Sequence, residues 1–122
     1  MSGLYVLIAG LNGAAMVALA AYGAHGANLS SAALFQTGWQ LHAVHSAVLL
    51  ALALHSPAGW LLRAGFFLMA AGICLFCGAL YLSGATGQSG GLAAPAGGMA
   101  LVASWLAIAA AGALRLVNHG KA

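Results

Sequence analysis

A near absence of charged side chains limits what this chain can fold into. Of its 122 residues, three are Lys or Arg, none is Asp or Glu, and 64% are hydrophobic. About a quarter of the residues of a typical soluble domain are charged, which keeps its surface hydrated. This chain cannot cover a surface that faces water, so we expect it to lie in a lipid bilayer as one domain, residues 1–122.

Four apolar segments approach the roughly 20 residues that a helix needs to cross a bilayer core. They cover about 4–24, 39–55, 61–83 and 97–117. Lipid offers no hydrogen bonds to the backbone, so a spanning segment must be a helix or a strand of a closed barrel. These segments lack the period-two alternation of barrel strands. Short connections make neighbouring helices antiparallel, which predicts an all-α, integral membrane bundle of four transmembrane helices.

The three positive charges predict the orientation of this bundle. With four spans, the N-terminus, the second connection and the C-terminus share one side, and Arg63, Arg115 and Lys121 all fall on it. Positively charged residues are retained on the cytoplasmic side of membranes. We therefore expect a bacterial inner-membrane protein with both termini in the cytoplasm. The charges are scattered, so the expected partner is the lipid bilayer and no nucleic acid.

The missing carboxylates also restrict the chemistry. Without Asp or Glu, the chain has no carboxylate acid–base pair, no carboxylate metal ligand and no acidic proton relay. This argues against an enzyme, and the sequence identifies neither a catalytic residue nor a cofactor.

Four polar residues are predicted to form a layer at the outer end of the bundle. His42 and His45 are three residues apart and share one face of the second helix, within its first two turns. His25 ends the first helix, and Tyr81 lies near the end of the third, both on the same side of the membrane. Ionisable groups inside a membrane usually face the bundle interior or a wet cavity.

Three interpretations of this layer stay open. The first is structural, with neutral imidazoles bonded to loop carbonyls. The second is a metal or haem site formed by His25, His42 and His45, although no carboxylate exists to orient the ligands. The third is a pocket for a small lipophilic molecule, such as a quinone or a lipid headgroup, with Trp39 and Tyr81 as walls. The candidate ligand-binding residues are His25, Gln36, His42, His45 and Tyr81.

Small residues recur at helical spacing. Gly10, Ala14 and Ala18 are four residues apart, and Gly65 and Gly72 lie in the third segment. In lipid, helices associate through close packing of such faces. These residues are expected to hold the monomer together, and the alternative is a contact face for a homo-oligomer or a larger membrane complex.

Two other patterns have structural interpretations. Cys74 and Cys77 share a face of the third helix, and we interpret them as two small packing residues. Tyr5, Trp39 and Trp60 lie at predicted span ends, where aromatic residues anchor helices at the membrane interface.

Several ordered motifs resemble those of a known family. They are Gly23-Ala24-His25-Gly26, Phe35-Gln36-Thr37-Gly38, His42-Ala43-Val44-His45, Phe76-Cys77-Gly78-Ala79-Leu80-Tyr81, Pro95-Ala96-Gly97-Gly98 and Trp105. Over nearly the whole chain they resemble the YgdD-like family of small bacterial inner-membrane proteins, a domain of unknown function with mitochondrial relatives. The resemblance implies a four-helix fold and no known activity.

The resemblance also suggests which residues matter. It implies structural roles for Gly23, Gly38, Gly78, Pro95, Gly97, Gly98 and Trp105, beside the polar residues His25, Gln36, His45 and Tyr81. The sequence departs from the family pattern at Leu41, Cys77 and Ala94, each of which replaces a hydroxyl-bearing residue. These changes weaken the case for a fixed hydrogen-bonded chemistry in the outer layer.

Taken together, the residues favour a non-enzymatic accessory or assembly subunit, or a binder of a lipophilic ligand. One alternative is a metal- or haem-binding redox membrane protein, or a subunit of one, that uses the histidines as ligands. Another is a channel or carrier for a small neutral solute. A carrier needs a continuous polar path, and below the outer layer the first two helices offer only Asn12 and His55.

Overall fold

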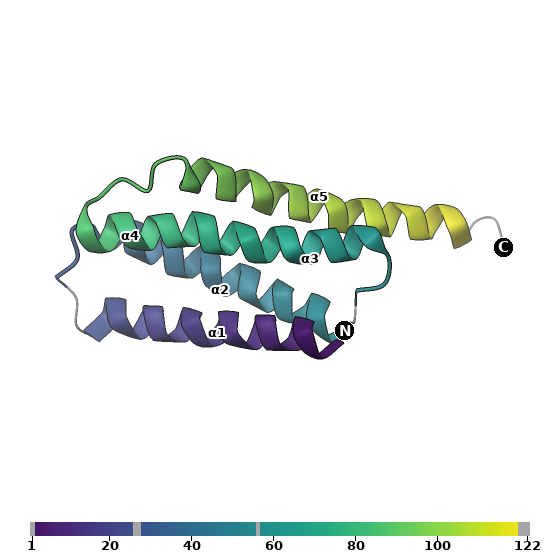
Figure 1. Ribbon diagram of the computed structural model, residues 1–122, viewed down its shortest axis with the longest axis horizontal. Helices are drawn as coiled ribbons and strands as arrows, with labels where there is room; N and C mark the ends of the chain where they lie inside the picture. The colour runs from purple at the N-terminus through teal and green to yellow at the C-terminus, as the bar shows by residue number, and fades with distance from the viewer. Residues whose placement is uncertain (1, 26–27, 56, 120–122) are drawn as a thin grey trace.

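Four helical rods make up the computed structural model, which describes residues 2–25, 28–55 and 57–119 (Figure 1). The helices are α1 (Ser2–His25), α2 (Ala32–Leu54), α3 (Trp60–Gly72), the π-helix η1 (Ile73–Cys77), α4 (Gly78–Thr86) and α5 (Ala93–His119). The segments α3, η1 and α4 follow one another without a break and form a single rod. No strand occurs in these ranges, so the prediction of an all-α protein with four long helices is confirmed.

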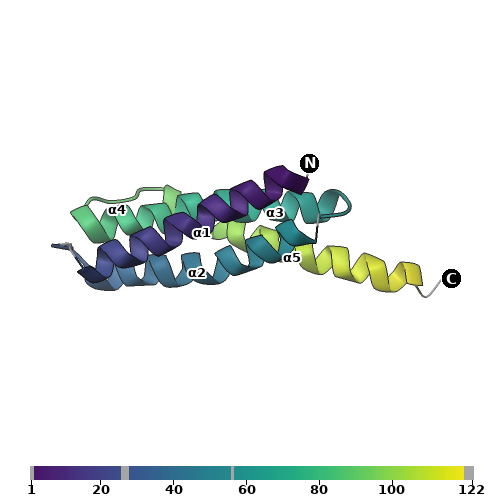
Figure 2. The ribbon, with the colours of Figure 1, turned by 90° about the horizontal axis from the view of Figure 1, so that it is seen from below.

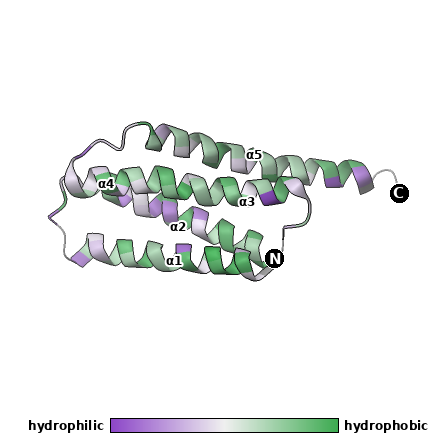
Figure 3. Cartoon of the chain, viewed as in Figure 1, coloured by the Kyte–Doolittle hydropathy of each residue, from purple (hydrophilic) through white to green (hydrophobic). Residues whose placement is uncertain are grey.

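Each rod is long and apolar enough to cross a membrane. The spans are Gly3–His25, Ala32–Leu54, Trp60–Thr86 and Ala93–Asn118. Apolar residues run along every helix, and the polar colours gather along α2 and near the helix ends (Figure 3). Large side chains such as Leu7, Leu11 and Leu106 are exposed on the outside of the bundle, as in residues that contact lipid. The chain is therefore a multi-pass membrane protein.

Neighbouring rods run antiparallel (Figures 1 and 2). α1 packs on α2, α2 packs on α4, and α5 packs on α3 and η1. The N-terminus, the connection from α2 to α3 and the C-terminal part of α5 lie at one end, where α5 extends past the start of α3 (Figure 1). We call this the basic end, because Arg63 and Arg115 lie there. Lys121, the third residue used to predict orientation, is outside the described residues. The opposite end is called the distal end.

α2 begins seven residues earlier than the predicted span of 39–55. The Ser31 hydroxyl caps the helix by accepting a hydrogen bond from the backbone N–H of Leu34 (3.4 Å). Thr37 donates its hydroxyl hydrogen to the Ala33 carbonyl (2.9 Å), so this polar side chain is satisfied within the helix. Hydropathy is lowered by such residues although they do not interrupt the helix. His42 and His45 consequently lie near the midpoint of α2, and not in its first two turns.

The π-helix η1 interrupts the third rod near its middle. Cys74 is exposed and Cys77 is buried, so the interpretation of both as packing residues fits Cys77 alone. The i→i+5 hydrogen bonding of a π-helix adds a residue to the turn, which rotates residues three apart away from each other. Apolar periodicity did not indicate this feature, because the segment is apolar throughout.

Three glycines allow close contact between rods. A Cβ on Gly97 would lie 2.8 Å from the Leu75 Cβ and would collide with the backbone nitrogen of Phe76 in η1. A Cβ on Gly72 would lie 2.8 Å from the Leu101 side chain. Gly84 meets the backbone of α2 in the same way. Glycine is needed at these positions because the backbones of adjacent helices nearly touch.

The small residues of α1, unlike these three glycines, do not lie at a contact between rods. Gly10, Ala14 and Ala18 are exposed, and a Cβ on Gly10 would meet nothing within 4 Å. Gly78 likewise faces away from the other described helices. The stripe on α1 therefore does not hold the monomer together, and it lies open on the lipid-facing side.

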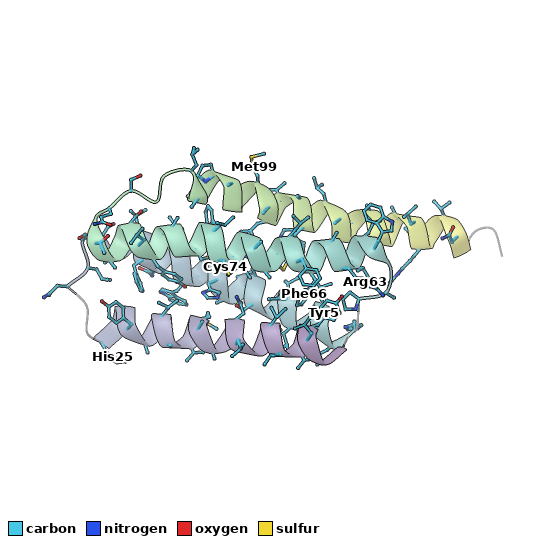
Figure 4. All side chains as sticks on the ribbon, in the orientation of Figure 1. Tyr5, His25, Arg63, Phe66, Cys74 and Met99 are labelled. Atoms are coloured by element: carbon cyan, nitrogen blue, oxygen red, sulfur yellow. The ribbon has the colours of Figure 1, made fainter. Side chains whose placement is uncertain are left out.

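The best-buried part of the core lies toward the basic end. Phe66 is 0% exposed, and its ring meets that of Tyr5 edge to face, with centroids 4.7 Å apart (Figure 4). Tyr5 is only 3% exposed, so its predicted place in an interfacial aromatic belt is wrong. Helix rotation turns Tyr5 toward α3, whereas Trp60, at the start of α3, is 74% exposed.

Candidate functional site

Polar side chains meet in the middle of the bundle, and we call them the central polar cluster. Its members are Asn12, His42, His45, Ser46, Tyr81 and Trp105. α2 supplies three of them because residues 42, 45 and 46 lie on one helical face that points inward, and all three are buried. The cluster therefore joins α2 to α1, α4 and α5.

His42 and Tyr81 form the most buried pair of the cluster. Nδ1 of His42 lies 2.9 Å from the Tyr81 hydroxyl oxygen, and the two side chains are 4% and 8% exposed. Tyr81 finds an acceptor for its hydroxyl hydrogen if it donates to Nδ1, which places the imidazole hydrogen on Nε2. Nε2 is buried and has no hydrogen-bond partner among the described residues. The pair thus fixes α2 against α4 through one hydrogen bond.

Both nitrogens of His45 are engaged. Nδ1 donates to the Leu41 carbonyl (2.7 Å), and Nε2 accepts a hydrogen bond from the indole N–H of Trp105 (3.3 Å). A nitrogen that accepts from an indole N–H carries a lone pair, so this arrangement defines one neutral tautomer. Metal binding through Nε2 would require Trp105 to move away.

Two further polar pairs connect helices. Ser46 donates its hydroxyl hydrogen to the side-chain oxygen of Asn12 (2.6 Å), which links α2 to α1. Ser104 donates to the Gly65 carbonyl (2.7 Å), which links α5 to α3, and Ser104 is fully buried. Sequence reasoning did not identify Ser104, because a single serine in an apolar helix carries no periodic pattern.

The predicted site residues do not all come together. His25 is exposed at the distal end of α1 (Figure 4). The register of α1 on α2 explains its distance from His42 and His45, because Asn12 bonds to Ser46 whereas Gly23 lies against Phe35. Within residues 2–25, 28–55 and 57–119, no group of three or more His, Cys, Asp or Glu side chains is placed to hold a metal ion.

Gln36 belongs to a separate cavity, which we call the distal pocket. It lies between the distal ends of α1 and α2, has a volume of ≈ 380 Å³ and is mostly apolar. Its lining residues include Ala20, Gly23, Ala24, Phe35, Gln36 and Trp39. Three predicted residues, Gly23, Gln36 and Trp39, therefore lie together here, whereas Tyr81, the other predicted wall, belongs to the central polar cluster.

A larger groove on the outer side of α5 has a different character. Its volume is ≈ 530 Å³, and its lining includes Phe76, Pro95, Gly98 and Leu106. The lining is almost entirely apolar, so the groove has no group that would orient a polar ligand. Such a surface suits the acyl chains of the surrounding bilayer.

The other predicted structural residues lie at helix contacts. Gly38 contacts Leu80 and Tyr81 of α4, where a Cβ would lie 3.2 Å from each side chain. Gly23 faces the Phe35 ring, and Gly98 lies one residue after Gly97 against the Phe76 ring. Their structural roles stay predictions, which substitutions can test.

Replacing Tyr81 by phenylalanine is expected to destabilise the protein by about 1–1.5 kcal/mol, because the buried Nδ1 of His42 would lose its hydrogen-bond partner. The double variant His42→Leu/Tyr81→Phe should be more stable than the sum of the single changes, since it removes both polar partners. Unfolding by sodium dodecyl sulfate in mixed micelles measures these differences. The control is Tyr22→Phe, at a tyrosine that is 53% exposed. Equal losses for Tyr81→Phe and Tyr22→Phe would contradict the prediction.

Comparison with known proteins gives one match. A family model described as a protein of unknown function (DUF423) matches residues 19–98, in agreement with the resemblance to the YgdD-like family. No curated protein and no solved structure matches the chain significantly. The matched range contains His42, His45, Tyr81 and the whole lining of the distal pocket, whereas Asn12 and Trp105 lie outside it.

Proposed function

This chain belongs to the DUF423 family of unknown function, and from that premise we propose that it is a non-enzymatic membrane protein that binds a lipophilic ligand in the distal pocket. The observation that carries this proposal is the combination of apolar walls with the Gln36 amide and the Trp39 indole in one cavity of ≈ 380 Å³. Ligand sites in proteins typically have about 300–1,000 Å³, apolar walls and a few polar groups that orient the ligand.

The polar groups of the pocket define the ligand class. Neither the Gln36 amide nor the Trp39 indole makes a hydrogen bond within the described part of the chain. Gln36 can donate and accept, and Trp39 can donate. A ligand with an apolar body and one carbonyl or ester oxygen, such as a quinone or a lipid, satisfies both. It would enter from the bilayer, since the pocket lies between two helices that contact lipid.

The central polar cluster fits a structural role in this proposal. Its side chains bond mostly to one another and to helix carbonyls, and they link all four rods. A redox site would need histidines that converge, and a carrier would need a polar path between the two ends. We therefore favour ligand binding in the distal pocket over a redox site or a carrier.

We further propose that the protein lies in the bacterial inner membrane with the basic end in the cytoplasm. The support is that Arg63 lies at the start of α3 and Arg115 near the end of α5, and both of these helix ends lie at the same end of the bundle as the N-terminus (Figure 1). This agrees with the retention of positive charges on the cytoplasmic side. The distal pocket would then face the outer leaflet. An active alkaline phosphatase fused to the C-terminus would contradict this orientation.

Partly filling the distal pocket should weaken ligand binding. We expect decylubiquinone or a brominated phosphatidylethanolamine to quench Trp39 fluorescence saturably in a variant whose Trp60 and Trp105 are phenylalanine. Ala24→Phe should weaken this binding about tenfold, because an aromatic ring would occupy part of the cavity.

The matched control is Ala21→Phe, an exposed position on the same helix that does not line the pocket. It should leave the quenching curve unchanged. Quenching that does not saturate with either probe, or an equal effect of the two alanine substitutions, would disprove a binding site in this pocket.

A further inference from the structure

A second cavity lies at the basic end, and we call it the basic groove. It has a volume of ≈ 270 Å³ and is lined by residues of α2, α3 and α5 together with His55, the C-cap of α2. Its apolar part includes Val48, Leu52, Leu62 and Ile108, and its polar groups belong to His55 and Arg115. The groove thus combines an apolar channel with a permanent positive charge.

The sequence limits which groups can neutralise the positive charge of the basic end. Arg63 and Arg115 lie at the basic end, and the whole sequence contains no Asp or Glu. No side-chain carboxylate of this protein can therefore offset the positive potential there. In a bilayer, the nearest abundant anions are lipid phosphates, and each Arg near an anionic surface contributes about 1 kcal/mol of attraction.

We propose that the basic groove binds one anionic phospholipid, with its phosphate at Arg115 and an acyl chain along Val48, Leu52 and Ile108. Arginine pairs well with phosphate because its planar guanidinium offers two parallel N–H donors. The order of the lining residues agrees with this placement, because His55 and Arg115 lie toward the basic end, whereas Val48 and Ile108 lie nearer the middle of α2 and α5. This inference concerns a different site from the distal pocket and does not depend on it.

His55 favours a headgroup that carries hydroxyl groups. Its Nδ1 donates to the Ala51 carbonyl (2.9 Å), which leaves Nε2 as an acceptor. The glycerol headgroup of phosphatidylglycerol can donate a hydroxyl hydrogen to this nitrogen while its phosphate binds Arg115. Phosphatidylcholine has neither a net negative charge nor a headgroup hydroxyl, so it lacks both interactions.

Trp105 provides a reporter inside this groove. It lines the cavity, and its indole N–H is held by His45, so the ring has a defined position. A lipid acyl chain in the groove would therefore contact one face of a fixed indole. Bromine atoms on that chain quench tryptophan fluorescence at short range, which makes occupancy measurable.

The experiment uses the full chain with Trp39 and Trp60 replaced by phenylalanine, in phosphatidylcholine nanodiscs that contain a minor fraction of brominated lipid. We expect brominated phosphatidylglycerol to quench Trp105 more strongly than an equal fraction of brominated phosphatidylcholine. Arg115→Gln should lower this preference about fivefold, the effect of losing about 1 kcal/mol.

Arg63→Gln is the matched control, because it removes one positive charge from the same end at a residue that does not line the groove. It should retain the preference. Ala51→Phe, which narrows the groove without changing charge, should reduce quenching by brominated phosphatidylglycerol. A loss with this variant supports a groove site even if Arg115→Gln folds poorly.

Two results of the comparisons between lipids and between variants would overturn the proposal. One is equal quenching by the two brominated lipids, and the other is an equal effect of Arg63→Gln and Arg115→Gln, which would indicate a diffuse surface charge. A third arm adds excess inorganic phosphate at constant ionic strength. Unchanged quenching supports a lipid site, whereas displacement by phosphate would assign the groove to the free anion and disprove the lipid assignment.

Discussion

Gly97→Ala is expected to destabilise the protein by about 2–3 kcal/mol, an unusually large effect for the addition of one methyl group. The new Cβ would lie 2.8 Å from the Leu75 Cβ and would overlap the backbone nitrogen of Phe76. A backbone atom in the middle of a helix cannot move aside by itself, so α5 would have to shift away from η1. The same shift would strain the contact of Leu101 with Gly72.

Thermal unfolding in mild detergent, followed by circular dichroism, measures this loss. The neighbouring substitution Gly98→Ala is the control, because its Cβ would make an ordinary contact of 3.5 Å with the Phe76 ring. Alanine also favours a helix over glycine by up to about 1 kcal/mol. We therefore expect Gly98→Ala to be neutral or slightly stabilising. A similar fall in Tm for both variants would show that α5 does not approach η1 as closely as described.

Phe66→Ala is expected to destabilise the protein by about 3 kcal/mol, the lower end of the range for buried phenylalanines in soluble proteins. The ring of Phe66 is 0% exposed and packs on Tyr5 and Phe67. Its removal leaves a cavity that these neighbours cannot fill. The loss is smaller than in water because helices that separate within a membrane are solvated by lipid, so the packing term dominates.

The adjacent residue is the matched control for this substitution. Phe67 is 47% exposed, so Phe67→Ala exchanges protein contact for lipid contact and should cost less than about 1 kcal/mol. Unfolding in mixed micelles with sodium dodecyl sulfate gives both values under one condition. The prediction fails if the two variants have the same midpoint, since Phe66 would then face lipid as Phe67 does.

Membrane residence, the number of spans and their antiparallel order followed from the sequence. These properties depend on local quantities, namely the length of an apolar run and the scarcity of charge, which each segment carries without reference to its neighbours. The least accurate boundary was the start of α2, because Gln36 and Thr37 lowered the local hydropathy. Thr37 nevertheless bonds to its own helix at the Ala33 carbonyl, and this compensation depends on helical geometry that composition does not express.

The candidate site was predicted only in part. His42, His45 and Tyr81 lie together, which their helical spacing and the topology suggested. His25 is remote from them, and Gln36 belongs to the distal pocket. The separation arises from the register of α1 on α2, which depends on how Gly23 meets Phe35 and Asn12 meets Ser46, and no single segment contains that information.

Which face of each helix is buried was decided by the tertiary structure alone. In water, a buried face is apolar and an exposed one polar, but in lipid both are apolar, and α1 has almost no difference in hydrophobicity around its circumference. Hydropathy therefore did not distinguish Gly10 from Gly97, although Gly10 lies on the lipid-facing side and Gly97 touches the backbone of η1. Only the family resemblance implied a structural role for Gly97. The π-helix that contains Cys74 and Cys77 could not be predicted for a similar reason. Hydropathy does not depend on whether an apolar segment has α-helical or π-helical hydrogen bonding. The sequence determined that four helices cross the membrane, and packing between backbones determined how they are rotated and where their polar groups meet.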